Sequence, residues 1–116
     1  MGRIKGASHD LSFSSAARLE TIKGNIKRRL AVLNIGPTRA ALEVGRSRSW
    51  LSDVLLDDRY QMKLSIGMVQ DIADALNVEF LDLASNSPVA AKRLDEARAP
   101  KWLLNWRETH GEEASP

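Results

Sequence analysis

The sequence predicts an all-α protein with one folded domain. Apolar residues recur at helical spacing in several segments, glycines and prolines separate these segments, and no segment alternates apolar and polar residues as a strand does. With 116 residues, of which 43% are hydrophobic, the chain has enough apolar material for one core and is too short for two large domains.

The composition excludes several classes of protein. The chain has no cysteine, so it forms neither disulfides nor thiolate metal sites. His9 and His110 lie near the two ends, away from other metal-ligating residues, and no nucleophile with a nearby base and no phosphate-binding loop is recognised. We therefore expect no enzymatic activity and no cofactor. No apolar run reaches the roughly 18 residues of a membrane-spanning helix, and the first residues lack the apolar core of a signal peptide, so we expect a cytoplasmic protein.

Charge is unevenly distributed along the chain. Residues 1–63 hold 12 Lys and Arg against 6 Asp and Glu, a balance of +6, whereas residues 64–116 hold 5 against 9, a balance of −4. A basic half beside an acidic half indicates a surface that meets a polyanion, and nucleic-acid binding fits this pattern better than solubility alone.

The first predicted helix follows a polar segment. Residues 1–15 are rich in glycine, serine and charge without periodicity, and we expect a flexible arm there. From residue 16 the pattern predicts an amphipathic helix over residues 16–34. Its apolar residues recur at helical spacing: Leu19, Ile22, Ile26, Leu30 and Leu33. Lys23, Lys27, Arg28 and Arg29 occupy the other positions, which predicts a strongly basic outward side.

Two short helices come next. Gly36 and Pro37 end the first helix and begin another over residues 37–44, because proline suits the first position of a helix but not its interior. Gly45 follows as the residue for which a positive φ is easiest. We expect a third helix over residues 48–57, capped by Ser47. Its buried side holds Leu51, Val54 and Leu55, and its other side holds Arg48, Ser49 and Ser52.

The second half of the chain predicts further helices. Ser65 is expected to cap a fourth helix, in which apolar residues again follow helical spacing: Ile66, Val69, Ile72, Ala73 and Leu76. Asn77 is expected to cap a short fifth helix that holds Phe80, Leu81 and Leu83. The stretch SNSPV is a linker by composition, with Pro88 as its break, and residues 89–98 and 101–109 form two more helical pieces separated by Pro100. The expected organisation is a domain over residues 16–85 and a C-terminal extension over residues 86–116.

The run PTRAALEVGRSRSWLSDVL, followed by SIGMVQDIADALNVEFLDLA, resembles the Cro and lambda-repressor type of helix-turn-helix protein, the XRE family. The resemblance is carried by the Ala41 and Gly45 pair, Leu51 in the second motif helix, and Ala73 and Leu76 in the later IADALNV segment. It covers about residues 18–84 and implies a five-helix lambda-repressor-like helix-turn-helix domain with a short helical C-terminal extension. It also implies a transcriptional regulator that binds double-stranded DNA at specific sequences, a repressor rather than an activator because the chain shows no sensor region.

In this family the second motif helix enters the major groove, and its first residues reach base edges. The resemblance implies that Arg48, Ser49 and Ser52 face the bases. Arg48 would donate two hydrogen bonds to guanine O6 and N7, whereas the serines would read several bases or contact phosphate or water. The alternative for Arg48 is a solvated arginine at the start of a helix.

Contacts to the DNA backbone and to flanking positions are expected from several segments: Arg39, Arg46, Ser47, Trp50, Arg59, Lys63, Lys27 and Arg28. Trp50 has two interpretations, one as a contact to a thymine methyl or the sugar-phosphate backbone and one as packing within the domain. Asp53 would repel phosphate, so we expect it to pair with Arg46 or Arg39. For each cation taken singly, simple solvation is the alternative.

The chain departs from the family pattern in two places. Gly36 and Pro37 stand where a glutamine commonly orders the recognition side chain and a phosphate, and Asp57 and Asp58 stand where a glycine often ends the recognition helix. The two carboxylates oppose both the helix dipole and DNA. These departures affect the expected docking angle and affinity rather than the expected fold.

The C-terminal segment KWLLNWRETH is expected to place Trp102, Leu103 and Trp106 on one side of a short helix. They would fold back over the core or join two subunits, with base stacking as a remote third interpretation. Family members usually bind as dimers whose recognition helices lie about 34 Å apart, so we expect a homodimer on an inverted repeat. The alternative function is an antitoxin-like or phage-regulatory interaction module whose tryptophan segment binds a protein partner.

Overall fold

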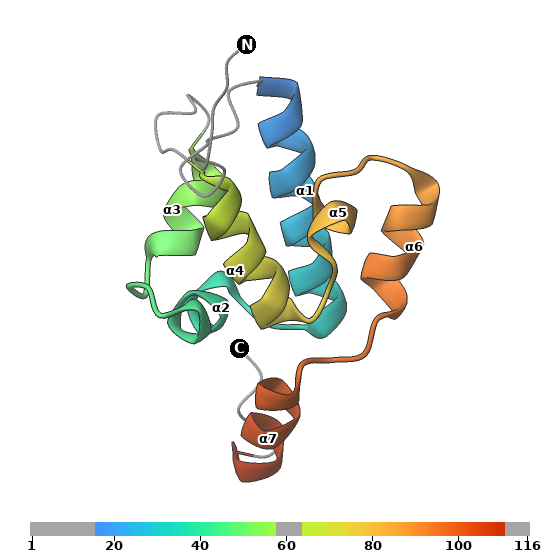
Figure 1. The fold of residues 1–116 in the computed structure, drawn as a ribbon. Coiled ribbons are helices and arrows are strands. Elements are labelled where there is room, and N and C mark those ends of the chain that lie inside the picture. The colour runs from blue at the N-terminus through green and yellow to red at the C-terminus, as the bar shows by residue number, and fades with distance from the viewer. Residues whose placement is uncertain (1–15, 58–63, 111–116) are drawn as a thin grey trace.

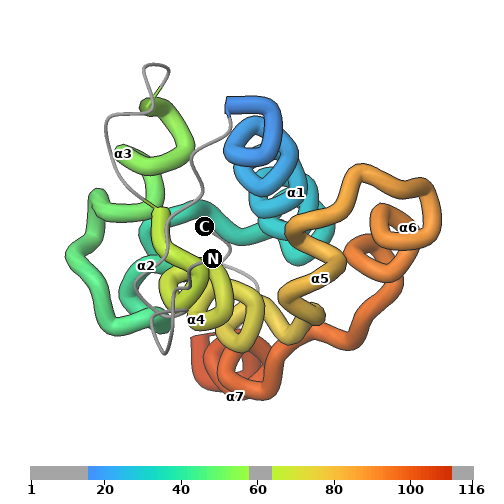
Figure 2. Tube along the Cα trace, turned by 45° about the horizontal axis from the view of Figure 1, so that its top comes forward, coloured from blue at the N-terminus to red at the C-terminus, as the bar shows by residue number. Residues whose placement is uncertain are grey.

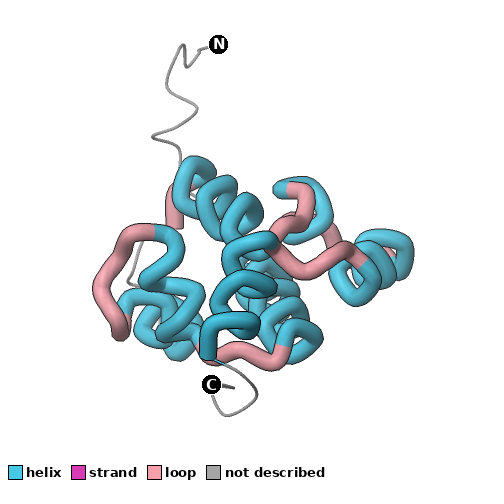
Figure 3. The backbone as a smooth tube through the Cα atoms, turned by 90° about the horizontal axis from the view of Figure 1, so that it is seen from below, coloured by secondary structure: helices cyan, strands magenta, loops and turns pink. Residues whose placement is uncertain are grey.

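The computed structural model describes residues 16–57 and 64–110. The helices of the described part (Figure 1) are α1 (Ala16–Leu33), α2 (Pro37–Val44), α3 (Trp50–Leu56), α4 (Ile66–Leu76), α5 (Phe80–Leu83), α6 (Pro88–Glu96) and α7 (Lys101–His110). They make this part of the chain predominantly helical, with short connections between them (Figure 3). At this level the predicted all-α class is confirmed. The arm expected over residues 1–15 lies outside the described residues.

The helices are arranged around α1 and α4. In Figures 1 and 2, α2 and α3 lie on one side of this pair and α6 lies on the other, next to α5. One buried apolar cluster joins them, and it includes Ile22 of α1, Leu51 of α3, Ile72 of α4, Leu94 of α6 and Leu103 of α7. The last two helices therefore share the core with the segment before them. Among the described residues, no helix is both long and apolar enough to cross a membrane.

Three helices end on a residue in the left-handed conformation. Asn34 has φ 57°, Gly45 has φ 88° and Asn77 has φ 58°. At each end this residue and its successor donate their backbone N–H groups to carbonyls of the last turn, an arrangement that satisfies helix ends. The predicted role of Gly45 is confirmed. The prediction that Asn77 caps the fifth helix is wrong, because Asn77 ends α4 and α5 begins after Glu79.

Two helices begin with a serine cap. The Ser65 hydroxyl accepts a hydrogen bond from the Met68 N–H at 3.1 Å, as predicted, and the Ser87 hydroxyl accepts one from the Ala90 N–H at 3.1 Å. Pro88 is therefore the first residue of α6 and does not break the chain there, because the first position of a helix needs no N–H donor.

Two basic residues of α1 point inward. Lys23 is 6% exposed and Arg29 is fully buried, so the prediction that they belong to a strongly basic outward side is wrong for both. The Lys23 Nζ donates to the Asp57 carbonyl at 2.7 Å, which holds the end of α3 against α1. Arg29 lies three residues after Ile26 and seven after Ile22, a spacing that places it on the apolar face.

Candidate nucleic-acid interface

The candidate interface is built on the α2–α3 pair. Two small buried residues, Ala40 and Ala41, let α2 approach α3 and α4 closely. At the end of α2, the Gly45 N–H donates to the Leu42 carbonyl at 3.0 Å and the Arg46 N–H to the Ala41 carbonyl at 2.9 Å. The chain then turns through residues 45–49, all of which are exposed, and enters α3.

The start of α3 differs from the prediction. The helix spans Trp50–Leu56 and begins after Ser49, whose side chain makes no capping hydrogen bond. Ser47 does not cap it with its side chain; instead the Ser47 carbonyl accepts from the Trp50 N–H at 3.1 Å. The tight turn formed by this bond places Arg48 and Ser49 just before the helix rather than in its first turn.

The three residues expected to face bases lie together around this turn and the first turn of α3. Arg48 and Ser49 are exposed, and Ser52 is half-buried. The Arg48 guanidinium makes no hydrogen bond or ion pair with another described residue. Its donors are therefore available to an outside partner. On the opposite side of α3, Leu51 and Val54 are buried in the core as predicted, and they fix the helix beneath these residues.

Arg46 and Trp50 form a stacked pair beside Arg48. The Arg46 guanidinium carbon lies 4.9 Å from the centroid of the Trp50 ring. Trp50 is half-buried and packs against the apolar cluster, so its ring is held in place. A cation over an aromatic face is attracted by the electrons of the ring. Trp50 thus packs within the domain, one of its two interpretations, and at the same time supports an exposed cation.

Arg39 faces α7 instead. Its guanidinium carbon lies 5.8 Å from the ring centroids of both Trp102 and Trp106, and its Nη2 lies 3.6 Å from Glu43 Oε2. The Arg39 Nε is buried and makes no hydrogen bond within the described part of the chain. The structure therefore brings Arg39 together with the C-terminal tryptophans, an arrangement that the sequence interpretation did not include.

Asp53 does not form the expected ion pair with a described residue. Arg39 pairs with Glu43 and Arg46 stacks on Trp50, so neither candidate partner is used. Asp53 is exposed in the first turn of α3. A carboxylate in this position interacts favourably with the positive end of the helix dipole without an ion pair.

The two α1 cations expected at the backbone have different surroundings. Lys27 is exposed at the edge of an apolar hollow of about 380 Å³, which Ser52 and Leu55 of α3 also line. Arg28 is also exposed but forms a two-bond ion pair with Asp95 of α6, with Nε–Oδ1 and Nη2–Oδ2 distances of 2.7 Å each. The hydrogen bond from Arg28 lowers the pKa of Asp95 from its ordinary value. Arg28 thus faces α6, and Arg59 and Lys63 lie outside the described residues.

The C-terminal tryptophan helix folds back over the core. Leu103 is fully buried, so the expectation that it contacts another subunit or partner does not fit the described structure. Trp102 and Trp106 are half-buried, and the Trp102 Nε1 donates to the Ala75 carbonyl at 2.6 Å. Of the open interpretations for this segment, the described chain shows the folded-back one.

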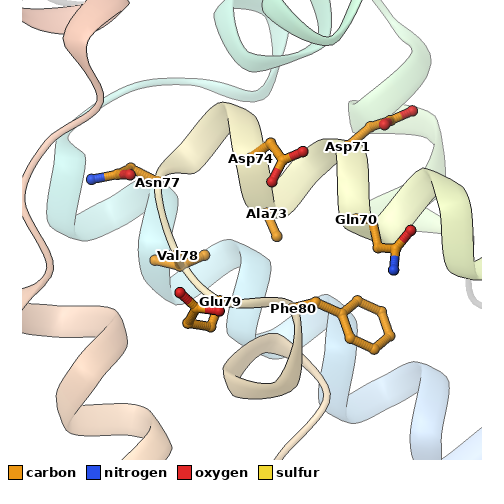
Figure 4. Close-up of a pocket in the computed structure, with 8 residues that line it drawn as sticks. All are labelled: Gln70, Asp71, Ala73, Asp74, Asn77, Val78, Glu79 and Phe80. Atoms are coloured by element: carbon orange, nitrogen blue, oxygen red, sulfur yellow. The ribbon is translucent and has the colours of Figure 1, made fainter.

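The surface of α4 and α5 has the opposite charge. A hollow with a volume of about 510 Å³ lies there. Figure 4 shows its lining residues, which are Gln70, Asp71, Ala73, Asp74, Asn77, Val78, Glu79 and Phe80. The carboxylates of Asp71, Asp74 and Glu79 make no ion pair with a described residue. Such a surface repels phosphate.

Sequence reasoning missed two polar residues of α1 that join this helix to several others. Arg29 bonds to carbonyls of α4, α6 and the segment after α6, and the Asn25 amide donates to the carbonyls of Leu83 and Ser85 at 2.8 and 2.7 Å. The helical spacing of Arg29 with Ile22 and Ile26 was a usable signal for its burial. For Asn25 no such signal exists, because its partners are main-chain atoms far along the chain.

Comparisons with known proteins found no relative of this chain. No protein-family model matches the chain, and neither a curated protein nor a solved structure matches it.

Proposed function

We propose that the chain is a transcriptional regulator that binds double-stranded DNA at specific sequences through a lambda-repressor-like helix-turn-helix, with α2 and α3 as its two motif helices. In this type of motif the second helix lies in the major groove and the first crosses the DNA backbone. The proposal involves no catalytic step and no cofactor. A protein of this kind acts most simply as a repressor, by occupying a promoter.

The observation that carries the proposal is the exposed, unpaired Arg48 at the entrance to α3. Its guanidinium has no described partner, while Leu51 and Val54 anchor the same helix in the core. A bidentate contact from arginine to guanine provides about 1–3 kcal/mol of discrimination against a wrong base. Ser49 and Ser52 lie beside it and would add weaker contacts to bases or phosphates.

Arg46 supports the same conclusion through phosphate binding. Its stacking on Trp50 at 4.9 Å orders the side chain before any partner arrives. An ordered cation loses less conformational entropy on binding, so its contact with a phosphate contributes more to affinity. Phosphate contacts of this kind position the protein, and Arg48 then reads the sequence.

We further propose that the regulator binds an inverted repeat as a homodimer. Two recognition helices about 34 Å apart would meet successive major grooves on one side of DNA. Because Leu103 is buried within the chain, the dimer contact is not assigned to it. Sedimentation of the free protein and of its DNA complex tests this part: a monomer in both samples contradicts it.

In vitro selection of random duplex DNA tests the function itself. Selection at a low and a higher salt concentration separates phosphate-driven binding, which salt weakens, from readout of sequence. We expect an enriched inverted repeat that survives the higher salt. Binding that disappears with salt and enriches no sequence contradicts the proposal. It would direct attention to a protein partner, the alternative function, although the inward-facing tryptophan helix gives that alternative no support.

A further inference from the structure

The C-terminal helix α7 bridges the ends of two other helices. At one point the Trp102 Nε1 donates to the Ala75 carbonyl of α4 at 2.6 Å, and at another the Arg107 guanidinium donates to the Leu33 carbonyl at the end of α1. Leu103 lies fully buried between these contacts. Figure 1 shows α7 at the end of the molecule, beneath the rest. Its position is thus defined by α1 and α4.

The segment that leads into α7 is fixed as well. Arg29 donates to the carbonyls of Ala97 at 3.1 Å and Arg98 at 2.8 Å, and the Asn77 side-chain amide donates to the Arg98 carbonyl at 2.9 Å. Pro100, the last residue before α7, is buried. Contacts with residues outside α2 therefore hold both the start of α7 and the face that it turns to the core.

Arg39 connects this fixed helix to α2. Its guanidinium lies at the same distance, 5.8 Å, from the rings of Trp102 and Trp106, and Glu43 one turn later on α2 lies 3.6 Å from its Nη2. The Nε of Arg39 is buried and makes no hydrogen bond to a described residue, so the aromatic contacts and Glu43 account for how the group is held. Cation–π contacts are stronger when the cation is partly desolvated in this way.

The inner face of α2 is made of small side chains. Its buried residues are Ala40 and Ala41, and Val44 is partly buried against the core, so α2 packs closely on α3 and α4. Arg39 adds a contact from the flank of the same helix to α7. This contact ties the position of α2 to that of α7.

We propose that Arg39 is a positioning residue through which α7 sets the position of α2, and with it the DNA affinity of the α2–α3 pair. The inference rests on the proposed function. Under this inference Arg39 affects DNA binding without contacting a phosphate. Trp102 and Trp106 likewise affect DNA binding without contacting DNA.

The salt dependence of DNA binding separates this role from a phosphate contact. Loss of one phosphate contact reduces the slope of log K against log salt by about one. Loss of a positioning contact leaves the slope unchanged and weakens binding at every salt concentration. We expect Arg39→Met to raise Kd roughly twofold to thirtyfold, the range typical of coupling through packed contacts, with an unchanged slope.

The experiment uses the full chain and duplex DNA, with fluorescence anisotropy as the measurement. The variants are Arg39→Met, Trp106→Leu and the double variant; Arg39→Lys, which keeps the cation over the rings, tests for rescue. Lys101→Ala, on the exposed side of α7, is the matched control and should bind like wild type. We expect the two single losses to be non-additive in the double variant and Arg39→Lys to recover part of the affinity.

Two further measurements, backbone amide shifts and the melting temperature, decide between the interpretations. The NMR chemical shifts of the Arg48 and Ser49 backbone amides should change in Arg39→Met. If Arg39 only stabilised the fold, its replacement would lower the melting temperature and leave these shifts and Kd unchanged. Additive losses, a reduced salt slope or an unchanged Kd would overturn the inference while DNA binding by the wild type stands. A wild-type protein that binds no duplex removes the proposed function and this inference with it.

Discussion

The side chain of Arg29 in α1 is hydrogen-bonded to the main chain of Leu76 at the end of α4, with an Nε–carbonyl distance of 3.0 Å. The same guanidinium donates to the carbonyls of Leu94, Ala97 and Arg98. Its charge therefore lies at the carboxyl ends of α4 and α6, where the helix dipoles favour a cation. Burial lowers the pKa of Arg29 from its ordinary value, yet arginine stays charged in proteins. One buried residue thus ties α6 and the segment before α7 to α1 and α4.

Replacement of Arg29 by methionine should strongly destabilise the protein. The substitution keeps an apolar stem but leaves four carbonyls without their charged donor, and we expect the free energy of unfolding to fall by about 3 kcal/mol. Urea unfolding of the two proteins measures this difference. Arg28→Met, at the neighbouring exposed position, is the control and should cost much less. Equal losses in the two variants would contradict the assigned role of Arg29.

The Arg28–Asp95 pair should make stability depend on acid pH. The pKa of Asp95 is lowered in the folded protein, chiefly by the hydrogen bond from Arg28. Its contribution is therefore fully present above the ordinary pKa of 3.8 and is lost as the pH falls below that value through the folded pKa. We expect wild type to be more stable than Asp95→Asn at neutral pH and the difference to shrink as the pH falls below 3.8. Urea unfolding over a series of pH values checks this, and a difference that grows in acid would oppose it.

A pair of glycine substitutions should have opposite effects. Gly45 has φ 88°, so Gly45→Ala should lower the free energy of unfolding by about 1–2 kcal/mol through backbone strain. Gly24 lies inside α1, and a Cβ there meets nothing within 4 Å. Gly24→Ala should therefore raise stability by about 0.5–1 kcal/mol. Thermal unfolding of both variants measures the two shifts; a stabilising Gly45→Ala is incompatible with the described turn.

Removal of the Arg46 side chain should weaken DNA binding without changing its specificity. Because we propose that Arg46 contacts phosphate, Arg46→Ala should lower affinity for all duplexes alike and reduce the salt slope by about one. Anisotropy titrations at several salt concentrations measure both quantities. A variant that keeps the wild-type slope would show that Arg46 does not reach the DNA backbone.

Local signals in the sequence predicted some elements well. The bounds of α2 follow from Gly36 and Pro37 at its start and Gly45 at its end, and the structure has the predicted helix over Pro37–Val44. The prediction of helix ends failed where one residue type can either begin or end a helix, or where two neighbouring residues can both cap it. Asn77 can begin or end a helix, and Ser47 and Ser49 are equally good caps by composition, so tertiary packing decided the start of α3 and the end of α4.

Long-range contacts could not be predicted from the sequence. Arg29 and Leu76 are 47 residues apart, and the carbonyls that satisfy Arg29 become neighbours only after α4 and α6 have packed. The same holds for Arg39, which a local interpretation assigns to phosphate but which the fold places against α7. In contrast, the exposure of Arg48 could be predicted from the motif around it, because this residue lies in the turn before α3.

The measurement that tests the central claim most directly is the affinity of three proteins for two duplexes. The proteins are wild type, Arg48→Ala and the control Lys92→Ala, which removes an exposed cation of α6; the duplexes are the selected inverted repeat and a scrambled version of it. We predict that Arg48→Ala binds the selected duplex about 5- to 150-fold more weakly and the scrambled one nearly as well as wild type does, while Lys92→Ala behaves like wild type. An Arg48→Ala protein that keeps the full preference for the selected duplex would contradict sequence readout by this residue.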